Sequence, residues 1–593
     1  ELTTRGMSSY QAACPLGLQS RLTFGAALAY LPFLIELPAP AFYAVSAVAW
    51  ACLAKSTYTA MLTVYAFAWT PIIARFSAPF LPKYTFSEDG SFYSADGAPA
   101  DVIAKRRAGM VYLASKFEEM SAGAEAKSLN HVIKEGLSDI RFTDTNRVPF
   151  PFQAVIRSKL NVSTVVKSSE GPWLIDTSGN RALDVSGSYG VNVCGYDRYK
   201  QFAKSGLATI EALGPNVLGP LHPVIAPVIS ALREVSGNEE VSFHMSGTEA
   251  VMCAVRLCRF NTRRPLIVTF AGAYHGWWDG VQPGPGNERP VVDVLCLKDM
   301  APASLALIKL RASEIACVLV SPLQGLNPNN SPPSDLVLMD SKMRKAEDSV
   351  RLYSAWLKNL REICTTSNVP LLFDEVYTGF RMAPKGAQQY YGVQADVVIY
   401  GKTLGGGMPC GVVCGKRELM RRFDPSRPVR VAYVIGTFAA APMILGCMDA
   451  FLKWVGSKEG VAAYSGAQEM TDDFITRGNK QLASEGLPLR MQNLTTVWTV
   501  LFTTPGRYHW LFQYYLRAEG VALSWVGTGR CLFSLDFTQG DYDALLTRLV
   551  AAARRMRDDG WWYAGVTSQQ IKRRMGTEFA KQILGLGDKV KAN

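Results

Sequence analysis

Two polar residues that could carry covalent chemistry each come directly after an apolar run. Lys402 follows Val397–Tyr400 by two positions and precedes the glycine run Gly405–Gly407. A lysine placed after a buried strand loses hydration, which lowers its pKa and suits a Schiff-base nucleophile. Asp374 ends the apolar run Leu371–Phe373 and could keep a pyridine nitrogen protonated. A buried Lys/Asp ion pair is the structural alternative, but such a pair costs more than it gains unless both groups are well partnered, which favours function.

A third segment suits an anionic group such as a phosphate. Val241–Met245 has the composition of a strand, and Ser246–Ala250 leads from it into a helix. A helix start offers free backbone N–H groups and the positive end of the helix dipole. Taken alone, this segment is better explained by Ser246 as an N-cap, with Glu249 closing a capping box. Together with Lys402 and Asp374, the phosphate interpretation is favoured.

These groups need a scaffold that brings strand ends together, and the chain beyond Arg147 has the pattern of one. Short apolar runs alternate with amphipathic segments, which is typical of an α/β protein with a mostly parallel sheet. Catalytic residues of such sheets lie just past the carboxyl ends of the strands. The predicted strands are Val241–Met245, Leu266–Phe270, Cys317–Ser321, Leu371–Phe373 and Val397–Tyr400.

Several motifs follow one another along this part of the chain. They are Trp173 with Asp176, Gly179 and Asn180, Ser246–Ala250, Tyr274-His275-Gly276, Asp374-Glu375-Val376 with Gly379-Phe380-Arg381, Gly386-Ala387-Gln388, Gly401-Lys402 with Gly405–Gly407 and Pro409, and Gly436-Thr437-Phe438 before Pro442. In order and spacing, from about Arg147 to Trp562, they resemble the class III (fold type I) pyridoxal-phosphate (PLP) aminotransferases. The glutamate-1-semialdehyde aminomutase branch of that family is the most similar.

The resemblance implies a fold type I architecture, with a mostly parallel sheet in a large domain and a small α+β domain. It also implies roles for individual residues. Lys402 would form the internal aldimine with PLP and move a proton between the substrate α-carbon and the cofactor. Asp374 would pair with the pyridine nitrogen, while Val376 and Tyr274 would pack on the two faces of the ring.

The resemblance extends to the phosphate and to a second subunit. Gly247 and Thr248 would hold the phosphate at the helix start. Thr437 would reach the phosphate of the neighbouring subunit, which implies a homodimer with the active site at its interface. Three further residues are candidates for positions near the substrate: Arg147, His275 and Gln324. Of these, His275 is expected to lie beside the stacking tyrosine rather than to act as a base.

Some positions depart from the family pattern. Ser321 replaces the acid often found at the end of its strand, and Gly436–Pro442 is more apolar than usual. Near Gly527–Gly529 there is no equivalent of the acid that the aminomutases place beside the substrate amine. The cofactor residues are intact, so these departures weaken only the expectation of glutamate semialdehyde as substrate and favour a less charged one.

Composition and charge limit the remaining classes. Lys and Arg number 62 against 50 Asp and Glu, a net charge of +12, but the basic residues are scattered and no nucleic-acid-binding signature accompanies them. The chain has 12 cysteines without the spacing of a small secreted domain, and only five histidines. We therefore expect no metal site and free buried thiols in a reducing compartment, such as cytoplasm or an organelle matrix or stroma.

The first part of the chain has a different character. Leu37–Ala54 and Ser56–Ala74 are uncharged runs of 18 and 19 residues, long enough to approach the ~30 Å thickness of a bilayer core. Leu22–Ile35 is too short to span. This predicts a membrane-associated segment over residues 22–82 that contacts lipid or a membrane partner, with an apolar arm on a partner protein as the alternative.

The expected organisation has four parts. Residues 1–82 form the hydrophobic segment, 83–146 a helical linker, 147–565 the aminotransferase and 566–593 a basic tail, and the catalytic fold should not depend on residues 1–82. The small domain would comprise about 147–214 and 446–565, and the large domain about 215–445. The predicted activity is a membrane-tethered PLP-dependent aminotransferase or aminomutase that moves an amino group from a small donor to an aldehyde or ketone. A catalytically silent structural subunit of a membrane assembly is the alternative, and decarboxylation or racemisation on the same fold stays open.

Overall fold

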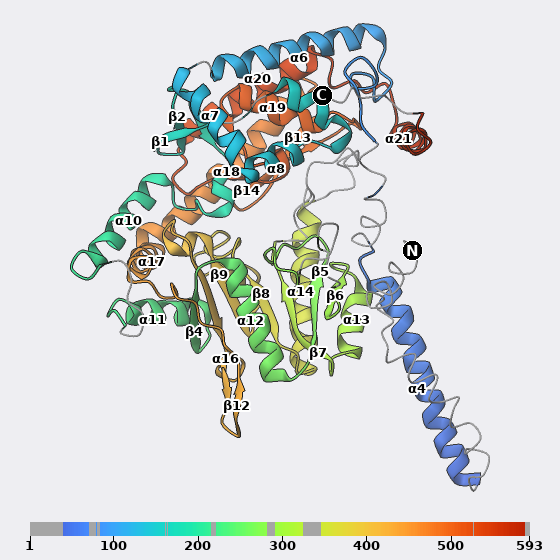
Figure 1. Cartoon of the computed structure of the whole chain (residues 1–593), viewed down its shortest axis with the longest axis vertical. Coiled ribbons are helices and arrows are strands. Elements are labelled where there is room, and N and C mark those ends of the chain that lie inside the picture. Colours follow the sequence, from blue (N-terminus) through green and yellow to red (C-terminus); the bar gives the residue numbers. More distant parts are fainter. Residues whose placement is uncertain are drawn as a thin grey trace.

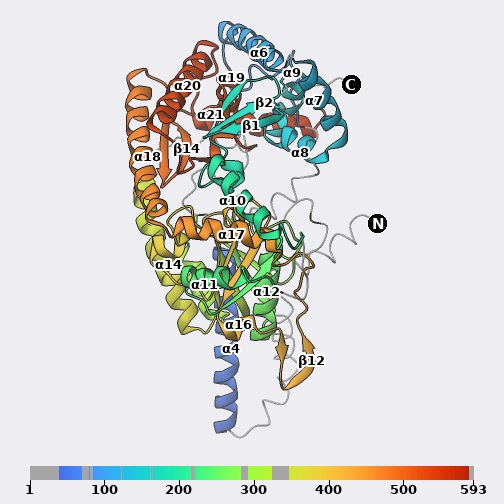
Figure 2. The same ribbon diagram turned by 90° about the vertical axis from the view of Figure 1, so that its left-hand side faces the viewer.

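The computed structural model describes residues 39–69, 79, 84–121, 123–160, 162, 164–214, 221–281, 287, 291–323, 346–525 and 527–586. Figures 1 and 2 show two packed bodies, one above the other, with a single helix extending from the lower body. The lower body contains the largest sheet. The upper body collects the helices between residues 100 and 146 and the C-terminal helices of the chain.

The lower body is built on a seven-stranded mixed sheet, as the alternating pattern predicted. Its strands run in the order β4-β10-β9-β8-β7-β5-β6, and only β10 is antiparallel to its neighbours. Their bounds in that order are Glu240–His244, Gly411–Gly415, Val397–Gly401, Leu371–Asp374, Ile315–Val320, Leu266–Phe270 and Val294–Leu297. The five strands predicted from apolar runs are all present, within two residues of the predicted bounds.

Both faces of this sheet are buried, because helices cover each side. Successive residues of each strand point to opposite sides and so belong to different cores. Leu372, Ile399 and Val413 pack on one face against helix α12 (Gly247–Thr262). Phe373 and Val398 belong to the core on the other face. That face is covered by α11 (Ile225–Ser236), α14 (Ala346–Thr366) and α17 (Pro442–Val455). The near-continuous apolar strands follow from this double coverage.

The upper body has a separate core. Two small sheets contribute to it, with orders β1-β2-β3-β15 and β13-β14-β16. The strands are Val166–Glu170, Trp173–Asp176, Arg181–Asp184, Val521–Ala522, Leu489–Leu494, Val497–Phe502 and Cys531–Leu532. Its helices include α6 (Ala100–Met120), α7 (Ala124–Gly136), α8 (Ser138–Asn146), α18 (Lys458–Ser484), α19 (Phe512–Ala518), α20 (Gln539–Asp558) and α21 (Ser568–Ile583).

The segment expected to be a linker is part of the upper core. Its two predicted helices are present as α6 and α7, but α6 buries Leu113 and Phe117 among the residues of the small sheets. Arg106 and Asp96 form a fully buried ion pair at 2.6 Å. A buried pair of this kind is destabilising unless both partners stay in place. The core of the upper body therefore includes residues that precede Arg147.

The two uncharged N-terminal runs form one helix, α4 (Ala39–Ala66), rather than two segments. Lys55 separates them in the sequence, but an α-helix readily accommodates a lysine, so the helix continues through it. Figure 1 shows α4 extending away from the lower body. Among the described residues, no helix combines the length and the apolar character needed to cross a membrane. Leu22–Ile35 and residues 70–74 lie outside the described residues.

The end of α4 joins the lower body, which differs from the expected independence of the catalytic fold. Leu62 and Phe67 are buried in its core. Phe67 pairs with Leu297 of edge strand β6, and two backbone hydrogen bonds continue this pairing, from Ala68 N to Cys296 O at 3.0 Å and from Lys298 N to Ala66 O at 2.7 Å. The last turn of α4 and the residues after it thus extend the sheet edge.

The described cysteines are free thiols, as predicted. Ten of the eleven are buried, and Cys52 on α4 is exposed. They are distributed over the two bodies, for example Cys531 in the upper core, Cys364 and Cys414 on one face of the large sheet and Cys258 on the other. No described group of His, Cys, Asp and Glu residues could hold a metal ion.

Candidate active site

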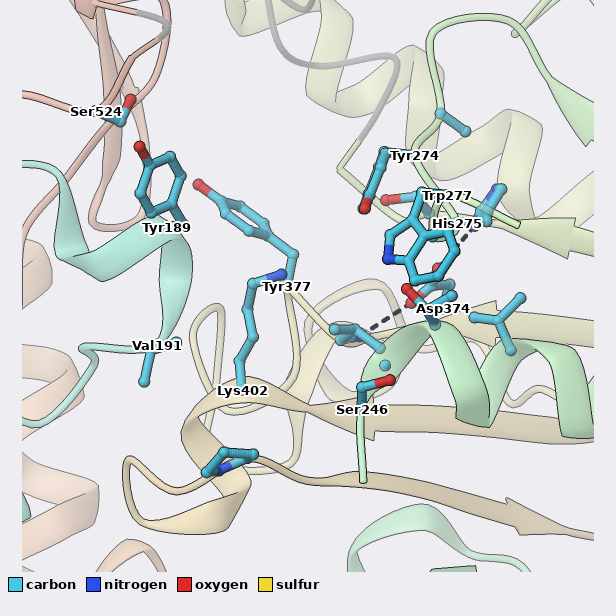
Figure 3. A pocket seen from close by; sticks show the side chains of 18 of the residues that line it. Tyr189, Val191, Ser246, Tyr274, His275, Trp277, Asp374, Tyr377, Lys402 and Ser524 are labelled. Carbon is cyan, nitrogen blue, oxygen red and sulfur yellow. Dashed lines mark hydrogen bonds and ion pairs between the residues drawn. The ribbon is translucent and has the colours of Figure 1, made fainter. Parts of the chain in front are cut away.

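A cavity of about 1060 Å³ lies where the carboxyl ends of β8 and β9 meet the upper body. The lower body contributes Lys402 and Asp374, and the upper body contributes Ser524 and Trp525. Figure 3 shows Ser524 on one side of this space and Asp374 on the other, with the side chain of Lys402 between them. The carboxyl end of a mostly parallel sheet is where ligands bind in such folds.

Lys402 begins a short 3-10 turn, Lys402–Gly405, directly after β9. Its backbone is left-handed, with φ of 48°, a conformation that non-glycine residues adopt mainly where the surrounding structure imposes it. Its Nζ lies 5.7 Å from the centroid of the Tyr377 ring. Gly190 leaves room for both, because a Cβ there would lie 2.7 Å from the Tyr377 ring and 3.4 Å from Lys402 Cδ. Burial lowers the pKa of the Lys402 amine, although the charge of Asp374 opposes this effect.

Asp374 ends β8 and is buried. One carboxylate oxygen accepts a hydrogen bond from Val376 N at 3.1 Å, and the other lies 2.7 Å from His275 Nδ1. A carboxylate can only accept, so His275 carries its proton on Nδ1. Its Nε2 is buried and has no partner among the described residues. His275 thus contacts the acid and orients it.

The start of α12 forms another wall of the cavity. Ser246 is its N-cap and accepts a hydrogen bond from Glu249 N at 3.2 Å, so the capping interpretation holds for the side chain. The same turn leaves Gly247 and Thr248 lining the cavity. A Cβ on Gly247 would lie 2.6 Å from Val376 Cγ1, so only glycine allows the helix start to approach Val376 this closely.

The loop after β5 supplies the opposite wall. Gly276 has φ of +88°, and a Cβ there would lie 2.6 Å from Thr248 Oγ1, so this loop also depends on a glycine to reach α12. Tyr274 and Trp277 line the cavity yet are 62% and 74% exposed. Large aromatic side chains this open to solvent are available to a ligand or to another subunit.

The predicted site residues fall into two groups. The cavity brings together Lys402, Asp374, Val376, Tyr274 and His275, with Gly247 and Thr248. Arg147 is not among the residues that line it, because its guanidinium is buried elsewhere and paired with Asp144 at 2.8 Å. Thr437 is exposed and does not line the cavity within one chain. Gln324 lies outside the described residues.

Several residues that line the cavity were missed in the sequence. Tyr377 directly follows the Asp374-Glu375-Val376 motif, and Arg530 directly follows Gly527–Gly529, where the aminomutase acid has no equivalent. Their motif positions were the only available signal. Tyr189, Trp525 and Phe142 come from segments that only the tertiary fold brings to the cavity.

Comparison with known proteins agrees with this geometry. The family model for class III aminotransferases matches residues 154–281 and 350–552. The chain belongs to the class III aminotransferases. The curated glutamate-1-semialdehyde 2,1-aminomutase of a Hydrogenobaculum species is 30% identical over 355 residues, which cover 57% of this chain and 77% of the relative.

Solved structures of class III aminotransferases and their relatives share the fold. A β-phenylalanine aminotransferase from Variovorax paradoxus is 26% identical, with a TM-score of 0.54 over 71% of this chain and 96% of the other. A glutamate-1-semialdehyde aminomutase from Pseudomonas aeruginosa, at 18% identity, matches in fold with a TM-score of 0.59 over 77% and 99%. Members of the family are typically dimers.

Pyridoxal phosphate is the cofactor of class III aminotransferases, and this chain is a PLP-dependent aminotransferase or aminomutase. The cavity fits such a group. It offers a buried carboxylate, a primary amine with a lowered pKa and the N-terminus of a 16-residue helix. The close approaches at Gly247 and Gly276 keep its walls free of side-chain atoms that would fill it.

Proposed function

We propose that this class III aminotransferase holds PLP in the cavity through Lys402 and transfers an amino group between a small amino donor and an aldehyde or ketone. The observation that carries the proposal is the convergence of three unlike groups in one cavity. They are the Lys402 amine, the Asp374 carboxylate and the start of α12. Each would contact a different part of one cofactor molecule.

The chain's own groups divide the binding work. The backbone N–H groups of Gly247 and Thr248 would bind the phosphate at the positive end of α12. Asp374, held by Val376 N–H and His275, would accept a hydrogen bond from the protonated ring nitrogen. Val376 and Tyr274 would pack on the two faces of the ring.

PLP supplies a carbonyl carbon for a primary amine and an electron sink for the bonds of the carbon that bears the donor's nitrogen. Lys402 would act next to that carbon. Because burial lowers its pKa, a larger fraction of the amine is neutral near pH 7 and can take up a proton from the donor carbon. The Lys402 Nζ would then return the proton at the other end of the transfer.

We also propose a homodimer with Thr437 of each subunit near the partner's cavity. Thr437 is exposed, and so are three large side chains around it: Tyr433 at 81%, Ile435 at 84% and Phe438 at 51%. Apolar side chains gathered in one exposed stretch are typical of an interface. Mixing an excess of Thr437→Trp subunits with Lys402→Ala subunits tests this, because only heterodimers with one complete site should regain activity.

The cofactor assignment is tested by borohydride reduction and peptide mapping of the PLP-loaded protein. The pyridoxyl label should lie on Lys402, and Lys402→Ala should lose conversion of the bound cofactor by amino donors while its circular dichroism stays unchanged. A label on another lysine, or a protein that takes up no PLP, would overturn the proposal. Conversion of the bound cofactor should be measured with a panel of amino donors. This panel should include glutamate 1-semialdehyde, which the names of the curated relatives contain.

The association of the N-terminal segment, residues 22–82, with a membrane or a membrane partner stays a separate proposal, as does a catalytic body on a reducing side. The exposed side chains of Trp50, Leu53 and Tyr58 support contact with something apolar. Flotation of the full chain with vesicles, compared with a Trp50→Ser, Leu53→Ser variant, would test that contact without reference to catalysis.

A further inference from the structure

A second cavity, of about 440 Å³, lies between three helices of the upper body, and we call it the upper pocket. Residues of α6, α7 and the short helix α9 (Gln153–Lys159) line it, and Figure 2 shows these helices next to one another. Cavities of roughly 300–1,000 Å³ are the size that small-molecule ligands occupy. Both α6 and α7 precede the part of the chain that matches the aminotransferase family, so this pocket is separate from the family's site.

The upper pocket carries an excess of positive charge. Lys127 and Lys134 line it from α7, where a spacing of seven residues places them on one face of the helix. Lys159 lines it from the end of α9 and is paired with Glu88 at 3.0 Å. Among the described residues that line the pocket, Glu118 is the only acid. Lys127 and Lys134 form no ion pair with a described residue, which leaves two ammonium groups for an anionic ligand.

Asn130 adds a buried polar group to the same wall of the pocket. Its residue is 7% exposed, and its Oδ1 has no hydrogen-bond partner among the described residues. Rotation of the amide exchanges its oxygen and nitrogen, so the side chain can accept or donate a hydrogen bond at this position. Buried polar atoms are normally partnered, and an unpartnered one at the wall of a cavity indicates a ligand that completes it.

The remaining lining favours a small organic phosphate. The Phe117 ring is buried and packs edge-on against Tyr514 at 6.2 Å, so the upper core holds it in place as an apolar surface of the pocket. Lysines bind phosphate as point charges, whereas a planar carboxylate is best matched by an arginine fork, and no arginine is among the described lining residues. A phosphate monoester carries a charge of about −1.5 to −2 near pH 7, which matches two free ammonium groups.

We propose that the upper pocket is a second ligand site and that it binds a small, soluble phosphate monoester with an apolar organic group. Lys127 and Lys134 would neutralise the phosphate, and the amide of Asn130 would donate a hydrogen bond to one of its oxygens. Phe117 would contact the organic group.

Binding should be detectable in α7, because this helix is weakly anchored. Of its described side chains, only those of Ala126 and Asn130 are buried. A helix that buries so little opens readily by local unfolding. A ligand that contacts α6, α7 and α9 at once would hold α7 in place and slow the exchange of its amide hydrogens.

The test titrates the PLP-loaded protein with phenyl phosphate and with phenyl sulfate, which has a similar shape and less negative charge. By calorimetry, the wild type should bind phenyl phosphate roughly 10-fold more tightly or better, and hydrogen exchange should show protection of α7. Combining Lys127→Gln with Lys134→Gln should weaken phosphate binding by roughly 10- to 100-fold. Lys167→Gln with Lys204→Gln is the matched control, because it removes the same charge from exposed positions that do not line the pocket.

Asn130→Leu serves as a second variant, because leucine has a similar branched outline and no polar atom. It should bind phenyl phosphate less tightly and, without ligand, melt no lower than the wild type, since an unpartnered buried atom is removed. A variant that binds as tightly as the wild type would contradict the role of Asn130 and overturn the proposed site.

Three further results would also overturn the proposal. They are equal affinity of the wild type for both ligands, unchanged binding in the double lysine variant, and protection confined to the cavity at the large sheet. A protein that ignores phenyl phosphate but binds vesicles containing phosphatidic acid through Lys127 and Lys134 would assign the site to a lipid headgroup instead. Binding is measured without turnover, so these outcomes are independent of the aminotransferase function.

Discussion

At the scale of single residues, Asp374 and His275 form a contacting pair whose members have different roles. Both side chains line the cavity, and His275 Nδ1 lies 2.7 Å from a carboxylate oxygen of Asp374. The carboxylate is the group whose charge matters to a bound pyridine nitrogen. His275 contributes by fixing the orientation of that carboxylate.

We expect Asp374→Asn to keep part of the PLP binding and to slow conversion of the bound cofactor by an amino donor. A hydrogen bond to a charged group contributes about 1.5–3 kcal/mol, so the rate should fall by roughly 10- to 100-fold or more. His275→Gln should fall less, because the charge of Asp374 remains. Stopped-flow absorbance with a saturating donor measures both, and a larger effect in His275→Gln than in Asp374→Asn would contradict this division.

The sequence was informative at this scale where a residue type and its position after a strand coincide. Lys402 and Asp374 were identified in that way, and both line the cavity. Arg147 does not line the cavity within one chain, because its guanidinium pairs with Asp144 three residues away, and the sequence alone carries no sign of such a partner. Arg530 also lines the cavity, but it precedes a short strand rather than following one, so this rule does not identify it.

At the scale of elements, Glu375 shows how one acid of the motif is structural. Its carboxylate accepts hydrogen bonds from Ala387 N at 2.6 Å and Gln388 N at 3.1 Å, at the start of α15 (Gly386–Tyr391). Gly386 has φ of +77°, and a Cβ there would lie 2.4 Å from Glu375 Oε2. The Gly386-Ala387-Gln388 motif and the second acid of the Asp374-Glu375 pair are thus two halves of one helix cap.

This cap predicts a pH dependence of stability. Burial raises the pKa of Glu375 from 4.5 to about 7, so the folded state holds its proton where the unfolded state has lost it. Its contribution therefore becomes less favourable as pH rises from about 4.5 to 7, by on the order of 3 kcal/mol. Glu375→Gln should remove that part of the dependence. Melting temperatures of both proteins between pH 5 and 7.5 measure it, and parallel curves would contradict the assignment.

Apolar runs in the sequence predict which strands are present, but they do not predict the order and pairing of all of them in the sheet. The parallel strands were predictable because both faces are buried and each run is uniformly apolar. Strand β10 was not, since a glycine-flanked pair of valines does not indicate that it lies antiparallel between β4 and β9. The packing of α6 was missed because its polar composition resembles that of an exposed helix, although Arg106 is buried with its acid.

At the scale of the whole molecule, the N-terminal helix has two parts with different surroundings. The side chains of Trp50 and Leu53 are exposed, whereas Leu62 and Phe67 are buried in the core of the large sheet. The sequence could not separate these parts, because both are equally apolar. The boundary between them is a property of tertiary packing with α13 (Pro302–Leu310) and β6.

Two truncations that end on either side of this boundary in α4 should therefore differ in their effect on thermal stability. Removing residues 1–57 should leave the melting temperature within about 2 °C of the full chain. Removing residues 1–82 should lower it by roughly 3–6 °C, because burial of Leu62 and Phe67 contributes about 1.5–3 kcal/mol each. Differential scanning fluorimetry measures the shift. Leu62→Ala and Leu53→Ala form a matched pair, and equal melting temperatures for these two variants would contradict the boundary.

The distribution of free thiols has a consequence for following how the molecule opens. In the folded state a thiol reagent should modify Cys52 quickly and the ten buried described cysteines slowly. Cys531 reports on the upper core, Cys364 and Cys414 on one side of the large sheet, and Cys253, Cys258 and Cys317 on the other. Mass spectrometry of a labelling time course would thus give a separate labelling rate for each core. The order in which the thiols react would reveal which body unfolds locally first.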